Sequence, residues 1–297
     1  MAKALERHTD ARLCTLVNKA NQQRGPFQLK LAFKDAKRLA KGLMGSILAR
    51  AQARYGVKLY GVTIMSNHLH LIVRTPNKNL ASFMNYVKAR SAEGLNFLLG
   101  RSGPFWSRRY DAQPILDDEA ALERLCYSTH NPVAAGLVHT AKQWPGLNLD
   151  YSCHTNHEGL RFEYLDKSAW HRAGRPDTLS PFFKEVELQL SALAKYEGLS
   201  PEHYQTLLQS AVPERPKPNK VLGLEALLKQ DFFSKPSRPK RSRRPYAFGH
   251  PERKAEHRAE ISALYEIYSQ ASERYRQGER HSSFPQGTYL PPFGLAA

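Results

Sequence analysis

The stretch LYGVTIMSNHLHLIV, from Leu59 to Val73, predicts two short β-strands joined by a tight turn at Ser66–Asn67. Successive side chains of a strand point to opposite faces of the sheet. We therefore expect the even-numbered residues from His68 to Ile72 on one face and the odd-numbered residues from Leu69 to Val73 on the other. One face then carries two imidazoles, and the other packs against a core.

The two histidines, His68 and His70, allow two interpretations. Imidazoles two residues apart on a strand can bind one divalent metal ion through their neutral ring nitrogens. On a half-buried strand the same pattern can equally be a pair of solvated or core-edge histidines. The tripeptide alone leaves both interpretations open, so the rest of the chain must decide between them.

The composition indicates a globular protein with a polyanionic partner. The 297 residues, 41% of them hydrophobic, suffice for one large or two modest domains with a proper core. Lysine and arginine number 44 against 27 acidic residues, and the formal net charge of +17 favours nucleic acid as the partner. No apolar stretch approaches the ~18 residues of a membrane span, and the charged N-terminus does not resemble a signal peptide. We expect a cytoplasmic, nucleoid-associated protein with no membrane partner.

The three cysteines, Cys14, Cys126 and Cys153, are too few and too scattered for a disulfide framework or a four-cysteine zinc site. We interpret them as free thiols. The cluster from Cys153 to His157 could hold zinc in principle, but it lacks a second ligand pair at the usual spacing.

Local patterns predict an alternation of strands and helices in the first half of the chain. Apolar residues at helical spacing predict helices over 35–55 and 80–99, and the acids at 117–119 predict the first turn of a third helix. Strand-like stretches lie at 13–17 and 106–115. Together with the hairpin, this order predicts an α+β fold with helices on a mostly antiparallel sheet.

The second half has a different character, and we place the boundary near residue 155. Residues 156–234 are expected to form a mainly helical extension, with helical patterns at Ser180–Ala211 and Val221–Phe233. Residues 235–250 are a basic, proline-interrupted linker or arm. Residues 251–297 are expected to form a charged helix followed by a tail.

Tyr127 and Asn131 are the second notable pair. Positions four apart on a helix share one face, so a hydroxyl and an amide would project together. Pro132 disfavours helical geometry at Asn131, which predicts that the pair lies at or near a helix end or kink. Taken alone, Tyr127 could be an ordinary interfacial tyrosine of an amphipathic helix.

Three blocks of the sequence together carry a specific resemblance. Met65–Val73, Phe105–Tyr110 and Tyr127–Val138 resemble the HUH-type single-tyrosine transposases, in particular the REP-associated tyrosine transposases of bacteria. The resemblance covers about Leu13–Tyr151, so residues 1–155 would be the transposase domain. It implies a ferredoxin-like antiparallel sheet of the HUH endonuclease type.

The resemblance also implies a site. In that family two histidines and an amide or carboxamide residue one helical turn beyond the tyrosine hold Mg²⁺ or Mn²⁺. The corresponding residues here are His68, His70 and Asn131 as metal ligands and Tyr127 as the nucleophile. The family commonly has proline where this chain has Ser66, which concerns only the rigidity of the turn.

The implied chemistry is coherent. A tyrosine hydroxyl has an ordinary pKa of ~10 and is a poor nucleophile without help. A divalent cation on the scissile phosphate neutralises its charge and orients it for in-line attack. The expected products are a 5′-phosphotyrosyl link and a free 3′-hydroxyl, and the reverse reaction joins strands. The family recognises imperfect palindromes, so the expected partner is single-stranded or hairpin DNA.

Single-stranded DNA is held by cations on the phosphates and by aromatic platforms for the bases. Two groups of residues have this character. The alternative for the first group is a core tryptophan flanked by solvated arginines, and the alternative for the second is a solvated linker. The candidate DNA-binding residues are Arg101, Trp106, Arg108 and Arg109 in the first group, and Lys240, Arg241, Arg243 and Arg244 in the second.

Other functions remain in competition with a DNA strand transferase. A non-catalytic regulator that binds hairpin DNA or RNA could keep the same fold and basic surface. A relaxase or replication initiator shares the histidine pair and tyrosine but normally has the motifs in another order. A plain metallohydrolase is disfavoured by the absence of a further ligand set in the sequence. Both a monomer and a homodimer are open.

Overall fold

The computed structural model describes most of the chain. The described residues are 13–19, 33–65, 67–98, 100, 102–107, 109–154, 159–211, 221, 223, 247–279, 281–285, 288 and 290.

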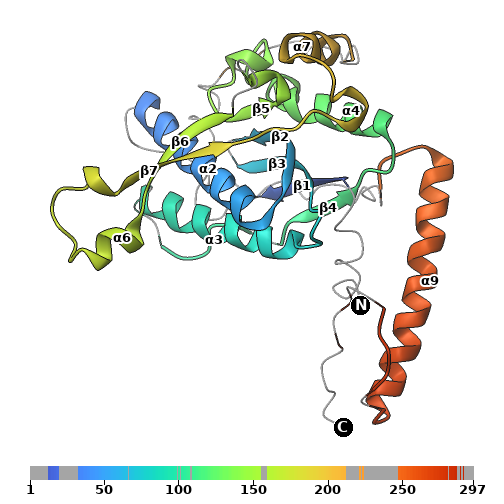
Figure 1. Ribbon diagram of the computed structural model, residues 1–297. Coiled ribbons are helices and arrows are strands. Elements are labelled where there is room, and N and C mark those ends of the chain that lie inside the picture. The colour runs from blue at the N-terminus through green and yellow to red at the C-terminus, as the bar shows by residue number, and fades with distance from the viewer. Residues whose placement is uncertain are drawn as a thin grey trace.

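The centre of the molecule is an antiparallel sheet. Its strands follow the order β4-β1-β3-β2-β5, with every neighbouring pair antiparallel. The order of the first four strands, with a helix after β1 and another after β3, is the ferredoxin-like arrangement. The α+β prediction is confirmed (Figure 1). The strands are β1 (Leu13–Lys19), β2 (Lys58–Ile64), β3 (His68–Arg74), β4 (Asp111–Pro114) and β5 (Asn148–Asp150).

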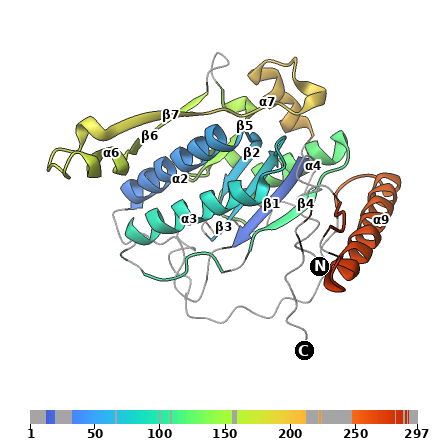
Figure 2. The same ribbon diagram turned by 60° about the horizontal axis from the view of Figure 1, so that its bottom comes forward.

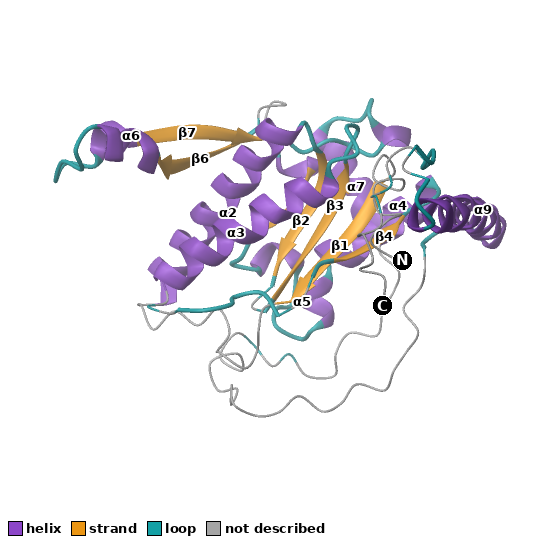
Figure 3. Cartoon of the chain, turned by 90° about the horizontal axis from the view of Figure 1, so that it is seen from below, coloured by secondary structure: helices purple, strands orange, loops and turns teal. Residues whose placement is uncertain are grey.

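One face of the sheet is covered by two long helices. The helices α2 (Phe33–Tyr55) and α3 (Leu80–Leu98) lie side by side across it, as Figure 3 shows from below. Odd-numbered residues of β3 meet them, and Leu71 is completely buried in the core formed with Phe83 and Met84. Both helices match the predicted ranges to within two residues.

The other face carries α4 (Asp118–Thr129) and the short α5 (Asn131–Ala134). Ile72 of β3 packs there with Leu125 and Cys126 of α4 in a second cluster. The predicted division of β3 is therefore confirmed, since alternate residues of one strand join two different clusters.

Local sequence explains the bounds of α4. The Asp117 side chain caps the first turn by accepting a hydrogen bond from the amide of Ala120 at 2.8 Å. The helix ends at Thr129, where His130 leaves helical geometry at φ −91°, ψ 2°. A new turn then starts with Pro132 near its beginning, so the kink predicted at Asn131–Pro132 is confirmed.

Gly61 lets α4 approach the sheet closely. The pairing of β2 with β3 shifts between Leu59 and Gly61, which is a β-bulge. A Cβ atom at Gly61 would lie 2.6 Å from Cδ1 of the fully buried Leu125. A glycine in the bulge therefore provides the space into which α4 packs.

The predicted helix over Ser180–Ala211 is wrong for most of its length. Phe183–Leu188 is a strand, β7, which pairs antiparallel with β6 (Leu160–Leu165). Val186, Leu188 and Leu190 are two residues apart, which is the spacing of a strand. The expected mainly helical extension thus begins as a β-hairpin, and within Ser180–Ala211 only α7 (Pro201–Ser210) is an α-helix.

The β6–β7 hairpin lies against α2 and extends from the body of the molecule (Figures 1 and 2). Phe162 of β6 sits over Gly45 of α2, and Leu188 and Leu190 join the core of the main sheet. The short helices around it are α6 (Lys167–Arg172), η4 (Ser180–Phe182) and η5 (Ala194–Tyr196), with η2 (Ala141–Gln143) and η3 (Tyr151–Cys153) earlier in the chain.

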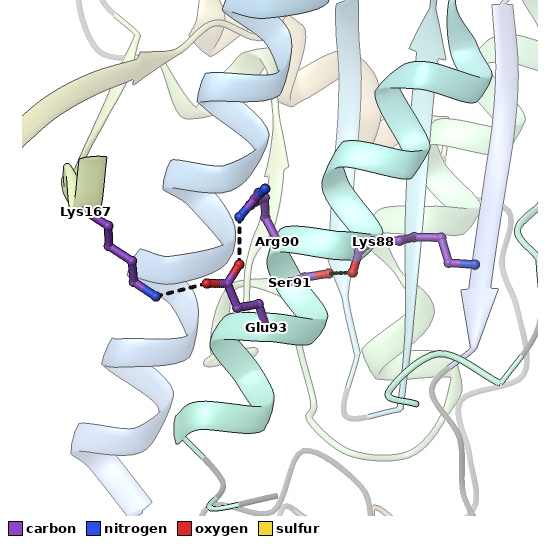
Figure 4. Close-up of polar contacts among 5 residues, drawn as sticks. All are labelled: Lys88, Arg90, Ser91, Glu93 and Lys167. Atoms are coloured by element: carbon purple, nitrogen blue, oxygen red, sulfur yellow. Dashed lines mark hydrogen bonds and ion pairs between the residues drawn. The ribbon is translucent and has the colours of Figure 1, made fainter. Parts of the chain in front are cut away.

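An ion-pair group fixes the outer end of this hairpin. Glu93 of α3 accepts hydrogen bonds from Arg90 at 2.8 Å and from Lys167 of α6 at 3.0 Å (Figure 4). The pKa of Glu93 is lowered, mainly by the hydrogen bond from Lys167. The contact joins α6, at the end of the hairpin, to the helical face of the sheet.

The charged helix predicted near the C-terminus is present as α9 (Pro251–Arg276), which stands beside β4 and α4 (Figures 1 and 2). The predicted helix at Val221–Phe233 and the basic run of the 235–250 linker lie almost wholly outside the described residues. Among the residues that the structure does describe, no helix has the length and apolarity to cross a bilayer.

Candidate active site

His68 and His70 lie at the start of the central strand β3, on the face covered by α4 and α5. Their ring centroids are 4.9 Å apart. His70 is 5% exposed and His68 is half-buried. Two imidazoles therefore converge at one end of the sheet, with one side chain deep and the other closer to solvent.

A neighbouring side chain orients His68. Its Nδ1 lies 2.6 Å from Oδ1 of Asn67, so the imidazole donates its Nδ1 proton to that oxygen. The tautomer defined by this contact leaves the lone pair on Nε2. Histidines that bind metals are typically held in this way by a partner on the opposite ring nitrogen.

The kink after α4 brings Asn131 and Tyr127 to the same place. The side-chain amide of Asn131 lies 3.3 Å from Nε2 of His70. The Tyr127 ring lies edge-on to the His70 ring, with centroids 6.1 Å apart. The structure thus brings together all four residues that the resemblance implied, from segments about sixty positions apart in the sequence.

These side chains fit a divalent cation. Imidazole nitrogen and amide oxygen are both ligands for Mn²⁺, and amide oxygen also suits Mg²⁺. The amide of Asn131 donates to the His70 lone pair here, and its oxygen and nitrogen can exchange places by rotation of the amide. His68, His70 and Asn131 are the residues that would hold the ion.

A buried polar network supports the site from behind. Thr63 of β2 is paired directly with His70 across the ladder and donates to Oδ1 of Asn148 at 2.8 Å. Ser128, next to Tyr127, donates to the Thr63 hydroxyl at 3.0 Å. Asn148 in turn donates to the backbone of Thr129 at 2.9 Å. The end of α4 is therefore tied to the strand that faces His70.

Arg124 is a feature that the sequence analysis missed. Its guanidinium carbon lies 5.0 Å from the centroid of the Tyr127 ring and 4.2 Å from that of Phe248. The spacing of Arg124 to Tyr127, three residues on a helix, was available as a signal. The contact with Phe248 could not be found in this way, because Phe248 lies 124 positions further along the chain.

Cys126 precedes Tyr127 but faces the interior. Burial raises the pKa of its thiol to about 11, and the nearby Asp150 acts in the same direction. Only the thiolate is an effective nucleophile, so this cysteine has no reactive form near neutral pH. This agrees with the interpretation of Cys126 as a free thiol.

The first group of predicted DNA-binding residues is only partly described. The indole nitrogen of Trp106 donates to the Lys88 carbonyl and to the Ser91 hydroxyl, both at 3.1 Å, and its ring packs on Phe105. This is the packing role that the sequence left as the alternative. Arg109 stacks over Tyr110. Arg101 and Arg108 lie outside the described residues, as do Lys240, Arg241, Arg243 and Arg244.

A separate acidic group does not make a metal site. Asp117, Glu119 and His250 have ligand atoms within 4.8 Å of one another. Asp117 already caps α4 and accepts from the amide of His250, and Glu119 forms an ion pair with Lys195. Helix capping and surface pairing account for this arrangement.

A comparison with family models finds a match within the first half of the chain. Residues 34–124 match the model for IS200-like transposases. The match covers α2, the histidine hairpin and most of α4, and ends just before Tyr127. This part of the chain is similar to IS200-like transposases.

One curated relative makes the resemblance more specific. A protein of Haemophilus influenzae assigned provisionally as a REP-associated tyrosine transposase is 28% identical over 102 residues, which are 31% of this chain and 58% of that protein. The chain thus matches less than two thirds of its relative. The resemblance to REP-associated tyrosine transposases is supported by this match.

Two solved structures are similar at low scores. A REP-associated tyrosine transposase bound to a REP hairpin gives 14% identity and a TM-score of 0.36 over 46% of this chain and 76% of that one. A protein of Deinococcus radiodurans assigned provisionally as a transposase gives 17% identity and a TM-score of 0.28, over 39% of this chain and 86% of that one. Because both scores are below 0.5, the fold described above rests on the strand pairing of this chain alone.

Proposed function

We propose that this protein cleaves and rejoins single-stranded DNA at hairpin-forming sequences through a 5′-phosphotyrosine on Tyr127. The observation that carries the proposal is the convergence of His70, Tyr127 and Asn131 at one end of an IS200-like domain. The relative named for REP-associated transposition favours a hairpin as the target.

The proposed reaction is a transesterification. The Tyr127 hydroxyl oxygen attacks the scissile phosphorus, so a P–O bond to tyrosine forms and the bond to the 3′ oxygen breaks. The phenol loses one proton and the departing 3′ oxygen gains one. Because the phosphodiester is kept as an ester of tyrosine, a 3′-hydroxyl can reverse the step and join strands without ATP.

Divalent-metal dependence is general in this transposase family. When bound to His68, His70 and Asn131, the cation would neutralise phosphate charge and orient the ester for in-line attack. His70 is buried, and its ring lies edge-on to the Tyr127 ring. This contact limits the directions in which the Tyr127 ring can turn. Asn131 is fixed by the turn that follows His130.

The strong positive charge of the chain supports DNA as the substrate. A net charge of +17 favours binding to phosphates, with an affinity that falls as salt rises. We propose that the candidate arginines and lysines of both groups contact this DNA, namely Arg101, Arg108, Arg109, Lys240, Arg241, Arg243 and Arg244. Trp106, with its indole satisfied by α3, would support that loop rather than stack on a base.

The experiment is a search for the covalent adduct. The full-length protein is incubated with labelled oligonucleotides that span hairpins from beside its own gene, with Mn²⁺, Mg²⁺ or chelator, and resolved on denaturing gels. We expect a metal-dependent, denaturant-resistant adduct that is lost in Tyr127→Phe and in His68→Ala. Tyr86→Phe, on the opposite face of the sheet, is the matched control and should form the adduct.

An adduct that survives in Tyr127→Phe would overturn the assignment of the nucleophile. Hairpin binding without adduct or cleavage, unaffected by metal, would instead support a non-catalytic regulator with the same fold.

A further inference from the structure

The segment Ala247–His250, which leads into α9, is attached directly to the entry of α4. Phe248 forms a parallel bridge with Ile115. Its amide donates to the Pro114 carbonyl at 2.8 Å, and its carbonyl accepts from the Leu116 amide at 2.8 Å. The next contact is made by the His250 amide, which donates to the Asp117 carboxylate at 2.7 Å. Three hydrogen bonds thus place this segment at the start of the helix that carries Tyr127.

The ring of Phe248 meets Arg124 at this position. The guanidinium carbon of Arg124 is 4.2 Å from the Phe248 centroid and 5.0 Å from the Tyr127 centroid. Attraction between a cation and the face of an aromatic ring is significant within about 6 Å. Arg124 therefore connects an aromatic ring of the C-terminal segment to the ring of the proposed nucleophile.

Arg124 is poorly solvated for a cation on a helix surface. Its side chain is 15% exposed and pairs with the carboxylate of Glu123. Its Nε is buried and has no hydrogen-bond partner among the residues that the structure describes. A guanidinium can be kept in such a place when aromatic faces stack on it, because Arg is more weakly hydrated than Lys.

Arg124 and Tyr127 belong to a row of side chains that runs from Phe248 to His70. Arg124 and Tyr127 are three residues apart and share one face of α4, and Asn131 follows just beyond the kink at His130, so the three side chains form a row. One end of the row meets Phe248, and the other meets His70. A change at Phe248 can therefore reach the tyrosine through one intervening side chain.

We propose that Arg124 is a positioning residue that holds the Tyr127 ring for attack, and that Phe248 makes the C-terminal extension a part of this active site. The proposal rests on the proposed function of Tyr127. It assigns a role to a region that lies outside the residues matched by the transposase family.

The first test separates the chemical step from DNA binding. The rate of adduct formation at saturating oligonucleotide should fall about tenfold in Arg124→Gln and in Phe248→Ala, since the lost cation–ring contacts are of that order. The dissociation constant for the hairpin should stay within about twofold, because Phe248 is not expected to touch DNA. Phe248→Tyr keeps an aromatic face and should restore the rate.

A matched control excludes a general effect of losing an aromatic ring. Phe183→Ala removes a 49%-exposed phenylalanine from β7, away from α4, and should leave the rate unchanged. Equal loss of rate in Phe183→Ala and Phe248→Ala would overturn the proposal. So would a full rate in Phe248→Ala, or a loss confined to the dissociation constant.

A second measurement does not depend on catalysis. The protein is labelled with ¹³Cζ-tyrosine, and the Tyr127 signal is identified by its absence in Tyr127→Phe. At pH 7 this signal should move in Arg124→Gln and in Phe248→Ala, and stay in place in Phe183→Ala. If wild-type protein forms no adduct but the Tyr127 signal still responds to Phe248→Ala, the proposed function fails and the coupling stands. A signal unmoved by Phe248→Ala rejects the coupling itself.

Discussion

The two faces of the central sheet are built on different principles. Toward α2 and α3, the strand β3 presents Leu69, Leu71 and Val73, which are buried among other apolar side chains. Toward α4, it presents His70 and Ile72, and His70 meets side chains that donate or accept hydrogen bonds. Neighbouring residues on one strand therefore serve packing on one side and polar contacts on the other.

This difference indicates which face contributes mainly to stability and which contributes mainly to the chemistry of the site. Apolar burial on the helical face is non-directional and tolerates small adjustments in geometry. Hydrogen bonds on the α4 face, such as that from Ser128 to Thr63, require defined distances and leave costly unpaired groups when they are broken. We expect substitutions on the first face to affect mainly stability, and those on the second to affect mainly function.

The sharpest test uses the adjacent residues Leu71 and His70. Leu71→Ala removes a completely buried side chain and should cost about 2–5 kcal/mol in the free energy of unfolding. The protein that remains folded should form the tyrosine adduct at a normal rate. His70→Ala should abolish the adduct while the loss of its contact with Asn131 costs only about 1 kcal/mol. Urea unfolding and the adduct assay provide the two measurements.

Reversed outcomes would break the comparison between the faces. If His70→Ala destabilises the fold more than Leu71→Ala, then His70 is a structural residue of the core. If Leu71→Ala lowers the adduct rate per folded molecule, the helical face also takes part in positioning the site.

A smaller effect is expected in the polar network behind the site. Thr63→Val preserves the shape of the side chain but leaves the Ser128 hydroxyl and Oδ1 of Asn148 without this partner. We expect a cost of about 1–3 kcal/mol, the range for unsatisfied buried groups. Ser128→Ala leaves the bond from Thr63 to Asn148 in place, so it should cost about 1 kcal/mol or less.

The rescue variant for this network is Thr63→Ser, which keeps the hydroxyl and should recover most of the stability in urea unfolding. Equal costs for Thr63→Val and Ser128→Ala would show that the chain of hydrogen bonds does not run through Thr63. The adduct rate should fall in Thr63→Val, because the end of α4 is then held less firmly opposite His70.

The sequence could predict the parts of the fold that depend on local spacing. Alternation in β3 placed the two histidines on one face, and Pro132 predicted the kink that turns Asn131 toward them. These outcomes follow from geometry within a few residues. The roles of Tyr127 and the metal ligands came from the resemblance, and they stay predictions until the adduct is sought.

Other parts depend on contacts that no local pattern encodes. Leu188 and Leu190 fit a helical pattern with some of their apolar neighbours and a strand pattern with others. The pairing of Phe183–Leu188 with Leu160–Leu165 decides in favour of the strand. Phe248 lies 124 residues after Arg124, and only the docking of the C-terminal segment onto Ile115 brings their side chains together. Long-range pairing therefore accounts for both failures.

The smallest predicted effect concerns the outer surface of the helical face, at Glu93. Its pKa in the folded protein is lowered by the hydrogen bond from Lys167, with burial acting in the opposite direction. A carboxyl with a lowered folded-state pKa stabilises the fold at pH values above its unfolded-state pKa. That contribution is lost as the pH falls through the folded-state pKa. Glu93→Gln should thus destabilise the protein at pH 7, and this cost should be smaller at pH 3.

The size of this effect tests whether the helical face depends on its surface charges at all. Glu93 is 48% exposed, so solvent and salt screen both ion pairs, and we expect a cost of about 0.2–1 kcal/mol that shrinks further in 1 M NaCl. Urea midpoints of wild type and Glu93→Gln at the two pH values measure it, with Glu185→Gln on β7 as the control. A cost at pH 7 above that of Leu71→Ala would mean that the attachment of α6 to α3, rather than the apolar layer beneath it, dominates this face. A cost as large at pH 3 as at pH 7 would assign the effect to packing of the Glu93 side chain and not to its charge.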